Sequence, residues 1–246
     1  MPARLSRQQQ FALTHFLDVT QSDSTTALSI LRQHNFNVET ALNDFFTRSP
    51  VPMEDMSQME SVFHKYATDI EGTKTILFEG FSQLAEDVGI DPGNIRWLVF
   101  LWKSEAAIMG EITEEEFIRG CRKVGALNLP HFSQKLADML HYIEDNRSFK
   151  QFYKWLFDYL KVDPEHKSVT VDNAVHAWRL VLTDRWSLTE DWCNFVSQQS
   201  KLKVVTRDLW NELLSFIETV GNDLTKWSAD DAWPSAIDQF CELKLV

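Results

Sequence analysis

Apolar side chains recur at three- and four-residue steps along most of the chain, the spacing that lines one face of an α-helix. Besides residues 149–160, the same spacing occurs in four stretches, residues 174–184, 189–199, 207–219 and 234–244. No strand-like alternation of convincing length occurs, so the pattern predicts an all-α fold. The clearest single helix lies within residues 149–160, and its apolar face would carry Phe149, Phe152, Tyr153, Leu156, Phe157 and Leu160.

Three short amphipathic segments come first, and a break containing Pro50 and Pro52 follows them. Asn37 is a suitable N-cap for the third segment. Three helices in about 40 residues bury little surface, so such a module would be only marginally stable alone. The expected organisation is a three-helix module over residues 1–47, a linker over 48–56 and a larger helical domain over 57–246.

Composition supports a folded chain with protein partners. Hydrophobic residues make up 44% and aromatic residues 12% of the 246 residues, which is ample for a dense core. The formal net charge is −12, so the phosphates of DNA or RNA would be repelled. An acidic surface instead favours basic protein partners.

The cysteines and the apolar runs bear on the compartment. Cys121, Cys193 and Cys241 are widely separated, and no disulfide framework or metal motif can be drawn from them. The longest apolar run, residues 97–102, is too short to span a bilayer, and residues 1–10 lack the apolar run of a signal peptide. We therefore expect a monomer in a reducing compartment (cytoplasm, nucleus or both) that binds no membrane.

The chain also resembles itself at an offset of 36 residues, which suggests that one helix–loop–helix unit is used twice. The second copy has features of an EF-hand loop: Gly110 at the turn, Ile112 two residues later, and Glu116 at loop position twelve. The matching positions are Val62 with Leu98, Phe63 with Val99, Tyr66 with Trp102, Ile76 with Ile112, Phe81 with Phe117, and Val88-Gly89 with Val124-Gly125.

Neither loop has the ligands that calcium requires. Glu105 fills position one of the second loop, but Ala107 and Met109 at positions three and five carry no donor oxygen. In the first copy Gly80 replaces the glutamate, and Lys74 stands at the turn. We expect two metal-free EF-hand-like motifs, with no metal and no cofactor.

A pair of such motifs without calcium could keep a permanent apolar groove for a partner helix. Residues 97–102, WLVFLW, could line both a core and a groove. One interpretation is therefore an EF-hand-like, helical peptide-binding adaptor with no role in protein modification.

An enzyme with a cysteine nucleophile is the rival class. Cys193 lies on a helical pattern with no histidine nearby in sequence, and buried structural thiols are the commoner case. His131, His141, His166 and His176 lack metal-ligand spacing. We expect no catalytic residue.

Negative charge is concentrated near the end of the sequence. Between residues 208 and 242 there are eight acids and a single base, Lys226, which gives this stretch a net charge of −7. Asp208 follows Thr206 by two residues, where an acid would complement the helix dipole, and Pro234 suits the start of the last helix. The excess of acids favours a basic partner.

Residues 8–47 resemble ubiquitin-associated domains in the hydrophobic spacing of FLDVTQSD and NFNVETALNDFF. The family's usual Met-Gly-Phe/Tyr loop is absent, and a helical trio that binds nothing is the alternative. The resemblance implies a ubiquitin contact at Val19, Thr20, Gln21, Leu42 and Phe46.

Residues 205–240, with RDLWNELL followed by DDAWPSAIDQF, resemble the PONY (DCUN1) domain of the defective-in-cullin-neddylation family. The order of a ubiquitin-associated-like module, paired EF-hand-like motifs and this segment agrees with that family. Its Asp-Ala-Asp patch binds the winged-helix domain of a cullin, which implies cullin contacts at Asp208, Ala232 and Asp238.

The resemblance further implies a non-catalytic, scaffold-type ligase component that promotes cullin neddylation. Such a protein would bind the cullin and the N-terminally acetylated neddylation conjugating enzyme. The pocket for the acetylated N-terminus would be lined by Phe81, Trp97, Leu98, Phe100, Leu101, Met109, Ile112, Leu160 and Leu180.

Overall fold

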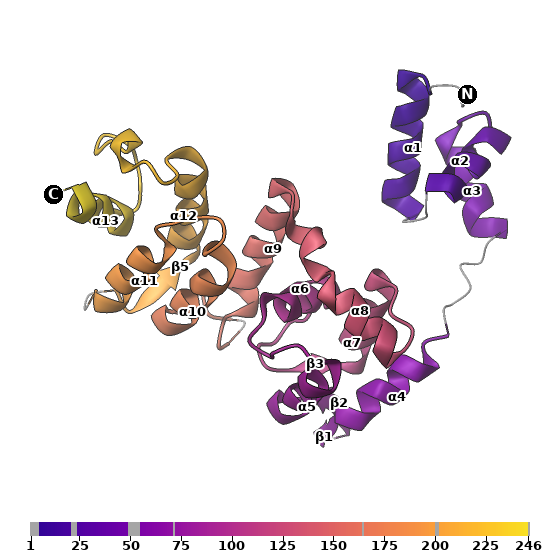
Figure 1. The fold of residues 1–246 in the computed structure, drawn as a ribbon, viewed down its shortest axis with the longest axis horizontal. Coiled ribbons are helices and arrows are strands. Elements are labelled where there is room, and N and C mark those ends of the chain that lie inside the picture. Colours follow the sequence, from indigo (N-terminus) through magenta and orange to yellow (C-terminus); the bar gives the residue numbers. More distant parts are fainter. Residues whose placement is uncertain are drawn as a thin grey trace. The chain divides into compact units, whose positions relative to one another are not determined.

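The computed structural model describes residues 5–20, 24–48, 55–70, 72–163, 165–199 and 202–245. Three helices form the N-terminal unit: α1 (Arg7–Thr20), α2 (Ser24–Gln33) and α3 (Val38–Arg48) (Figure 1). Asn37 caps α3, because its side-chain oxygen accepts a hydrogen bond from the backbone N–H of Thr40 at 3.1 Å, as predicted. The core of this unit consists of Ala12, Phe16, Ala27, Leu31 and Ala41.

Contacts divide the chain into two units, residues 1–55 and 56–246. The larger unit opens with two helix–loop–helix units, joined by antiparallel pairing of β2 with β3 that places Ile76 opposite Ile112. These two isoleucines are the pair that the 36-residue offset matches. The elements are α4 (Ser57–Tyr66), β1 (Thr68–Ile70), β2 (Thr73–Ile76), α5 (Phe78–Val88), α6 (Ile95–Ser104), β3 (Ile112–Thr113) and α7 (Glu114–Val124).

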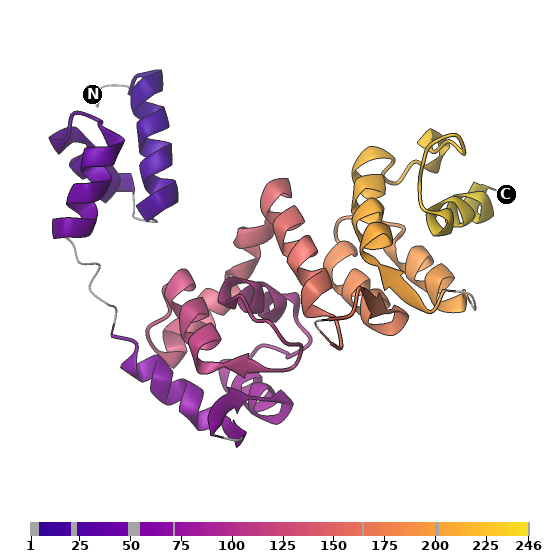
Figure 2. The ribbon, with the colours of Figure 1, turned by 180° about the vertical axis from the view of Figure 1, so that it is seen from behind.

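The second half of this unit repeats that arrangement. Strand β4 leads directly into α10 and β5 into α12, and the two strands pair antiparallel with Val169 opposite Val205, again 36 residues apart. Figure 2 shows this half of the unit from behind, in colours from pink to yellow. The elements are α8 (Leu129–Ala137), η1 (Met139–Ile143), α9 (Asn146–Tyr159), β4 (Ser168–Thr170), α10 (Val171–Leu182), α11 (Thr189–Gln198), β5 (Val204–Thr206), α12 (Arg207–Thr219), η2 (Leu224–Lys226) and α13 (Ser235–Leu245).

The fold class is confirmed as mostly helical, with a small N-terminal module and a larger helical domain. The described residues nevertheless contain five strands, which the sequence pattern did not predict. Each is two to four residues long, too short for an alternating pattern to emerge.

Aromatic packing fixes the start of α12. Trp210 stacks on Tyr153 with ring centroids 4.6 Å apart, and its indole N–H donates to the Tyr153 carbonyl at 2.9 Å. The Tyr153 hydroxyl in turn donates to the Trp210 carbonyl at 3.1 Å and accepts from the Trp178 indole at 2.9 Å. Because all three side chains are buried, this network holds α9, α10 and α12 in one register.

Candidate binding surfaces

An apolar cavity of about 460 Å³ opens in the larger unit between α5, α6, the loop before β3, the end of α9, and α10. All of the predicted pocket residues except Phe100 line it: Phe81, Trp97, Leu98, Leu101, Met109, Ile112, Leu160 and Leu180. The family resemblance therefore named side chains that are up to 99 residues apart in the chain and that the fold places around one cavity.

Phe100 does not line the cavity, in contrast to the prediction. On α6 the residues that face the cavity are Asn94 at the N-cap, Trp97, Leu98 and Leu101, which share one side of a 3.6-residue helix. Phe100 lies on the neighbouring side of α6 and is buried in the core. Its ring packs edge-on against the ring of Phe132, with the two centroids 4.9 Å apart.

Other lining residues were missed by sequence reasoning. His176 and Ala177 precede Leu180 by four and three residues on α10, so helical periodicity could have found them. Pro92, Gly93 and Asn94 form the turn that leads into α6, and the sequence DPGN at residues 91–94 is typical of such a turn, so these residues could have been predicted as well. No local signal marks Ile76, Phe78, Gly110, Glu111 and Tyr159 as cavity residues.

The loop that carries Met109, Gly110 and Glu111 into the cavity wall is closed by Glu116. One carboxylate oxygen accepts from the backbone N–H of Ala107 at 3.0 Å. The other accepts from the backbone N–H of Thr113 at 2.8 Å and from its hydroxyl at 2.9 Å. The carboxylate at loop position twelve thus joins the two ends of the loop through protein hydrogen bonds, where calcium would do so in an EF-hand.

The first loop is closed differently. A β-carbon at Gly80 would lie 2.0 Å from the Tyr66 carbonyl oxygen, so the close approach of α5 to the end of α4 requires glycine here. Gly72 has φ +87° in the β1–β2 turn, two residues before Lys74. The EF-hand likeness of both units stays a prediction. In the described ranges no group of three or more His, Cys, Asp or Glu side chains could hold a metal ion.

The predicted acidic residues both lie in the first turn of a helix. Thr206 caps α12, accepting from the Leu209 N–H at 3.2 Å, and Asp208 is exposed in the turn that follows. The neighbouring Arg207 forms two hydrogen bonds with Asp158 of α9, and this pair holds the pKa of the Asp158 carboxyl below its usual value. Asp208 therefore projects from a firmly anchored helix start.

Asp238 occupies the first turn of α13, where its backbone N–H donates to the Pro234 carbonyl at 3.3 Å. It is partly buried, and one of its carboxylate oxygens accepts from the Trp227 indole N–H at 3.0 Å. Ala232 is exposed in the loop just before this helix. Asp208, Ala232 and Asp238 are called the acidic patch below.

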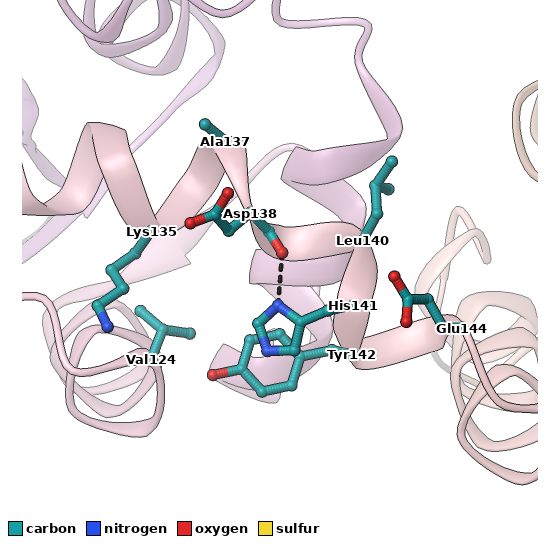
Figure 3. A pocket seen from close by; sticks show the side chains of 8 residues that line it. All are labelled: Val124, Lys135, Ala137, Asp138, Leu140, His141, Tyr142 and Glu144. Atoms are coloured by element: carbon teal, nitrogen blue, oxygen red, sulfur yellow. Dashed lines mark hydrogen bonds between the residues drawn. The ribbon is translucent and has the colours of Figure 1, made fainter.

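A second hollow has a different chemistry (Figure 3). Polar and charged side chains lie in it beside the apolar Val124, Ala137 and Leu140, and the Nδ1 ring nitrogen of His141 is 2.5 Å from the Asp138 carbonyl oxygen. Its charged residues are one base, Lys135, and two acids, Asp138 and Glu144. None of the predicted site residues lies here.

The three cysteines are buried. Burial raises the pKa of Cys193 to about 11 and that of Cys241 to about 12, and it also raises the pKa of Cys121. The Cys193 thiol contacts the Val175 carbonyl at 3.7 Å. At neutral pH these thiols are protonated and inaccessible, which is the opposite of an activated nucleophile.

The predicted ubiquitin contacts are only partly described. Val19 is exposed near the end of α1, whereas Thr20 and Leu42 are partly buried, and Leu42 packs against the small core. Gln21 lies outside the described residues, and so does the side chain of Phe46. These residues remain a predicted surface. Among the described helices none is long and apolar enough to cross a membrane.

Comparisons with known proteins agree with this organisation. The family model described as cullin binding matches residues 131–243, and the model of a UBA-like domain matches residues 10–50. DCN1-like protein 5 of Homo sapiens is 33% identical over 168 residues, which cover 68% of this chain and 70% of that protein. The chain belongs to the DCN1-like protein family.

Two further DCN1-like proteins match over longer stretches. DCN1-like protein 3 of Xenopus laevis is 31% identical over 196 residues, which cover 78% of this chain and 64% of that protein. DCN1-like protein 3 of Homo sapiens is 30% identical over 202 residues, covering 81% and 66%. The chain thus spans just under two thirds of the length of these relatives. The resemblance to a UBA-like module followed by a cullin-binding domain is confirmed.

Proposed function

We propose that this protein promotes cullin neddylation as a non-catalytic ligase component. It binds the winged-helix domain of a cullin through the acidic patch and the acetylated N-terminus of the conjugating enzyme in the apolar cavity. The match of residues 131–243 to the cullin-binding family carries the proposal, since that segment contains Asp208, Ala232 and Asp238. Its contribution to the reaction is to hold two partners together.

Physical chemistry supports a role by recruitment. Tethering two reactants raises their effective concentration and restricts their orientation, which accelerates transfer without any chemical group from the tether. The buried, protonated thiols support the absence of a nucleophile. An apolar cavity suits a short apolar terminus, whereas exposed acids at two helix starts suit basic side chains.

The test is a single-turnover assay in which a conjugating enzyme charged with the modifier transfers it to a cullin fragment. The protein should accelerate transfer. The triple variant Cys121→Ala, Cys193→Ala, Cys241→Ala should retain that acceleration, apart from losses explained by lower stability at the three buried sites. Removing the N-terminal extension of the conjugating enzyme should abolish it.

Two outcomes would contradict the proposal. A modifier–thioester on this protein that disappears with Cys193 would reveal an enzyme. Equal acceleration with the truncated conjugating enzyme would mean that the cavity does not recruit it.

A further inference from the structure

Two tryptophans of the segment before α13 differ in what their indole N–H groups do. The Trp227 N–H donates to Asp238 at 3.0 Å across eleven residues of chain. The Trp233 N–H is buried and has no hydrogen-bond partner in the described structure, although its ring packs edge-on against Phe216 at 5.4 Å. Both rings are partly buried against the core, so packing alone does not distinguish them.

The position of Trp227 is itself fixed. It ends η2, where its backbone N–H donates to the Leu224 carbonyl at 3.1 Å. Asp223 starts the same turn and accepts from the hydroxyl of Thr225 at 2.6 Å. This bond keeps the pKa of the Asp223 carboxyl below its usual value, so the turn is closed by an ionised cap at neutral pH.

Asp238 is also fixed through its backbone, because Ile237 next to it is buried in the core. What remains free in a first-turn aspartate is the rotation of its short side chain. The indole hydrogen bond engages Oδ1 and thereby selects one orientation, and within the described residues Oδ2 accepts no hydrogen bond. Asp208, by contrast, forms no side-chain hydrogen bond or ion pair in the described part of the structure.

We propose that Trp227 is a positioning residue of the acidic patch: its indole N–H holds the Asp238 carboxylate so that the free oxygen meets a basic side chain of the cullin. This inference rests on the proposed function. A preset carboxylate loses less side-chain freedom when the partner arrives, and partial burial strengthens its attraction for a cation. A hydrogen bond that orients one carboxylate oxygen leaves the charge of the group intact.

The two tryptophans provide a matched pair of variants. Trp227→Phe removes the N–H that holds Asp238 but keeps an aromatic ring. Trp233→Phe removes the same group from a neighbouring ring that has no partner for it. The affinity for an isolated cullin winged-helix domain should fall about five- to tenfold in Trp227→Phe, which is within the range for losing one typical intramolecular hydrogen bond, and less than about twofold in Trp233→Phe.

A loss of packing around Trp227 could also weaken binding. The proposed role therefore requires that the effect of Trp227→Phe disappear when Asp238 is absent. In an Asp238→Ala background, Trp227→Phe should change cullin affinity less than twofold. The indole N–H resonance of Trp227 should move in Asp238→Ala, while that of Trp233 should stay in place. Melting temperatures of all variants identify any that fail to fold.

Three results would overturn the inference. The first is wild-type cullin affinity in Trp227→Phe. The second is an equal loss of affinity when Trp227→Phe is made in the Asp238→Ala background. The third is a Trp227 indole N–H resonance that does not move in Asp238→Ala. A different result separates this failure from that of the proposed function. If Asp238→Ala and charge reversal of Asp208 both leave cullin binding unchanged, the docking surface itself is wrong, and the role of Trp227 falls with it.

Discussion

The apolar cavity and the acidic patch belong to the same unit but are built in opposite ways. The cavity takes its lining from five segments between residues 76 and 180, so it exists only when distant helices pack together. The acidic patch lies within residues 208–238 and depends on where two helices begin. A site made by burial should be sensitive to volume and to loop closure, whereas a site made by exposed charge should be sensitive to charge sign and salt.

The largest effect should come from placing a charge in the cavity. Leu98→Asp should weaken binding of an acetylated N-terminal peptide of the conjugating enzyme by at least about 100-fold, because a carboxylate in an apolar site lacks a partner. Leu243→Asp is the control, since Leu243 is 65% exposed on α13 and does not line the cavity. Fluorescence anisotropy with a labelled peptide gives both affinities. Equal peptide affinities for Leu98→Asp and Leu243→Asp would show that the cavity does not bind the N-terminus of the conjugating enzyme.

A smaller effect should follow from loosening the loop of the cavity wall. Glu116→Gln replaces one acceptor oxygen by an amide donor that faces backbone N–H groups, so it should cost about 2 kcal/mol of stability and about tenfold in peptide affinity. Glu115→Gln is the control, since that side chain is 84% exposed and pairs with Arg119 at the surface. Urea unfolding and peptide titration measure both quantities. Wild-type values for Glu116→Gln would show that the loop does not depend on this carboxylate.

Salt should separate the two surfaces in the wild-type protein. Raising the ionic strength from about 0.05 to 0.5 M should slow association with the cullin domain by roughly tenfold, because exposed charges are screened. Peptide binding in the cavity should change less than about twofold. Stopped-flow association rates at several salt concentrations test this contrast. The same salt dependence for the cullin domain and for the peptide would contradict it.

The smallest effect concerns the buried thiols and pH. Their folded-state pKa values are raised, to about 11 for Cys193 and about 12 for Cys241, so the native state retains protons that the unfolded chain loses. Their contribution is fully present below pH 9 and falls as pH rises toward these values, by about 1 kcal/mol for each thiol at pH 10. Urea unfolding at pH 8, 9 and 10 should show a shallower decline in Cys193→Ala than in wild type. The same slope in both would indicate that Cys193 ionises freely in the native protein.

The comparison also explains what could be predicted from the sequence. Asn37 and Asp208 were assigned correctly to helix starts because capping and dipole effects act over a few residues. Pro234 was expected in the first turn of the last helix, and it lies one residue before that helix, where its carbonyl accepts hydrogen bonds from the backbone N–H groups of Ile237 and Asp238. Local rules were sufficient for these positions.

Other features needed the packed structure. Tyr159 reaches the cavity because α9 ends beside the loop of Gly110, whose N–H donates to the Tyr159 hydroxyl at 3.4 Å. The pairing of β4 with β5 could not be predicted either, because each strand has only three residues and shows no alternating pattern. The Trp227–Asp238 bond was equally hidden, since nothing in the sequence distinguishes its indole from that of Trp233.

The most direct test of the account is calorimetric titration of a cullin winged-helix domain into the double variant Asp208→Lys, Asp238→Lys. Reversing both charges should weaken binding by at least about 100-fold, since like charges would then face each other across the interface. Glu86→Lys, Glu165→Lys changes the net charge equally at exposed positions outside the acidic patch and should bind within about threefold of wild type. Unchanged affinity in a folded Asp208→Lys, Asp238→Lys variant would contradict the assignment of the acidic patch to the cullin.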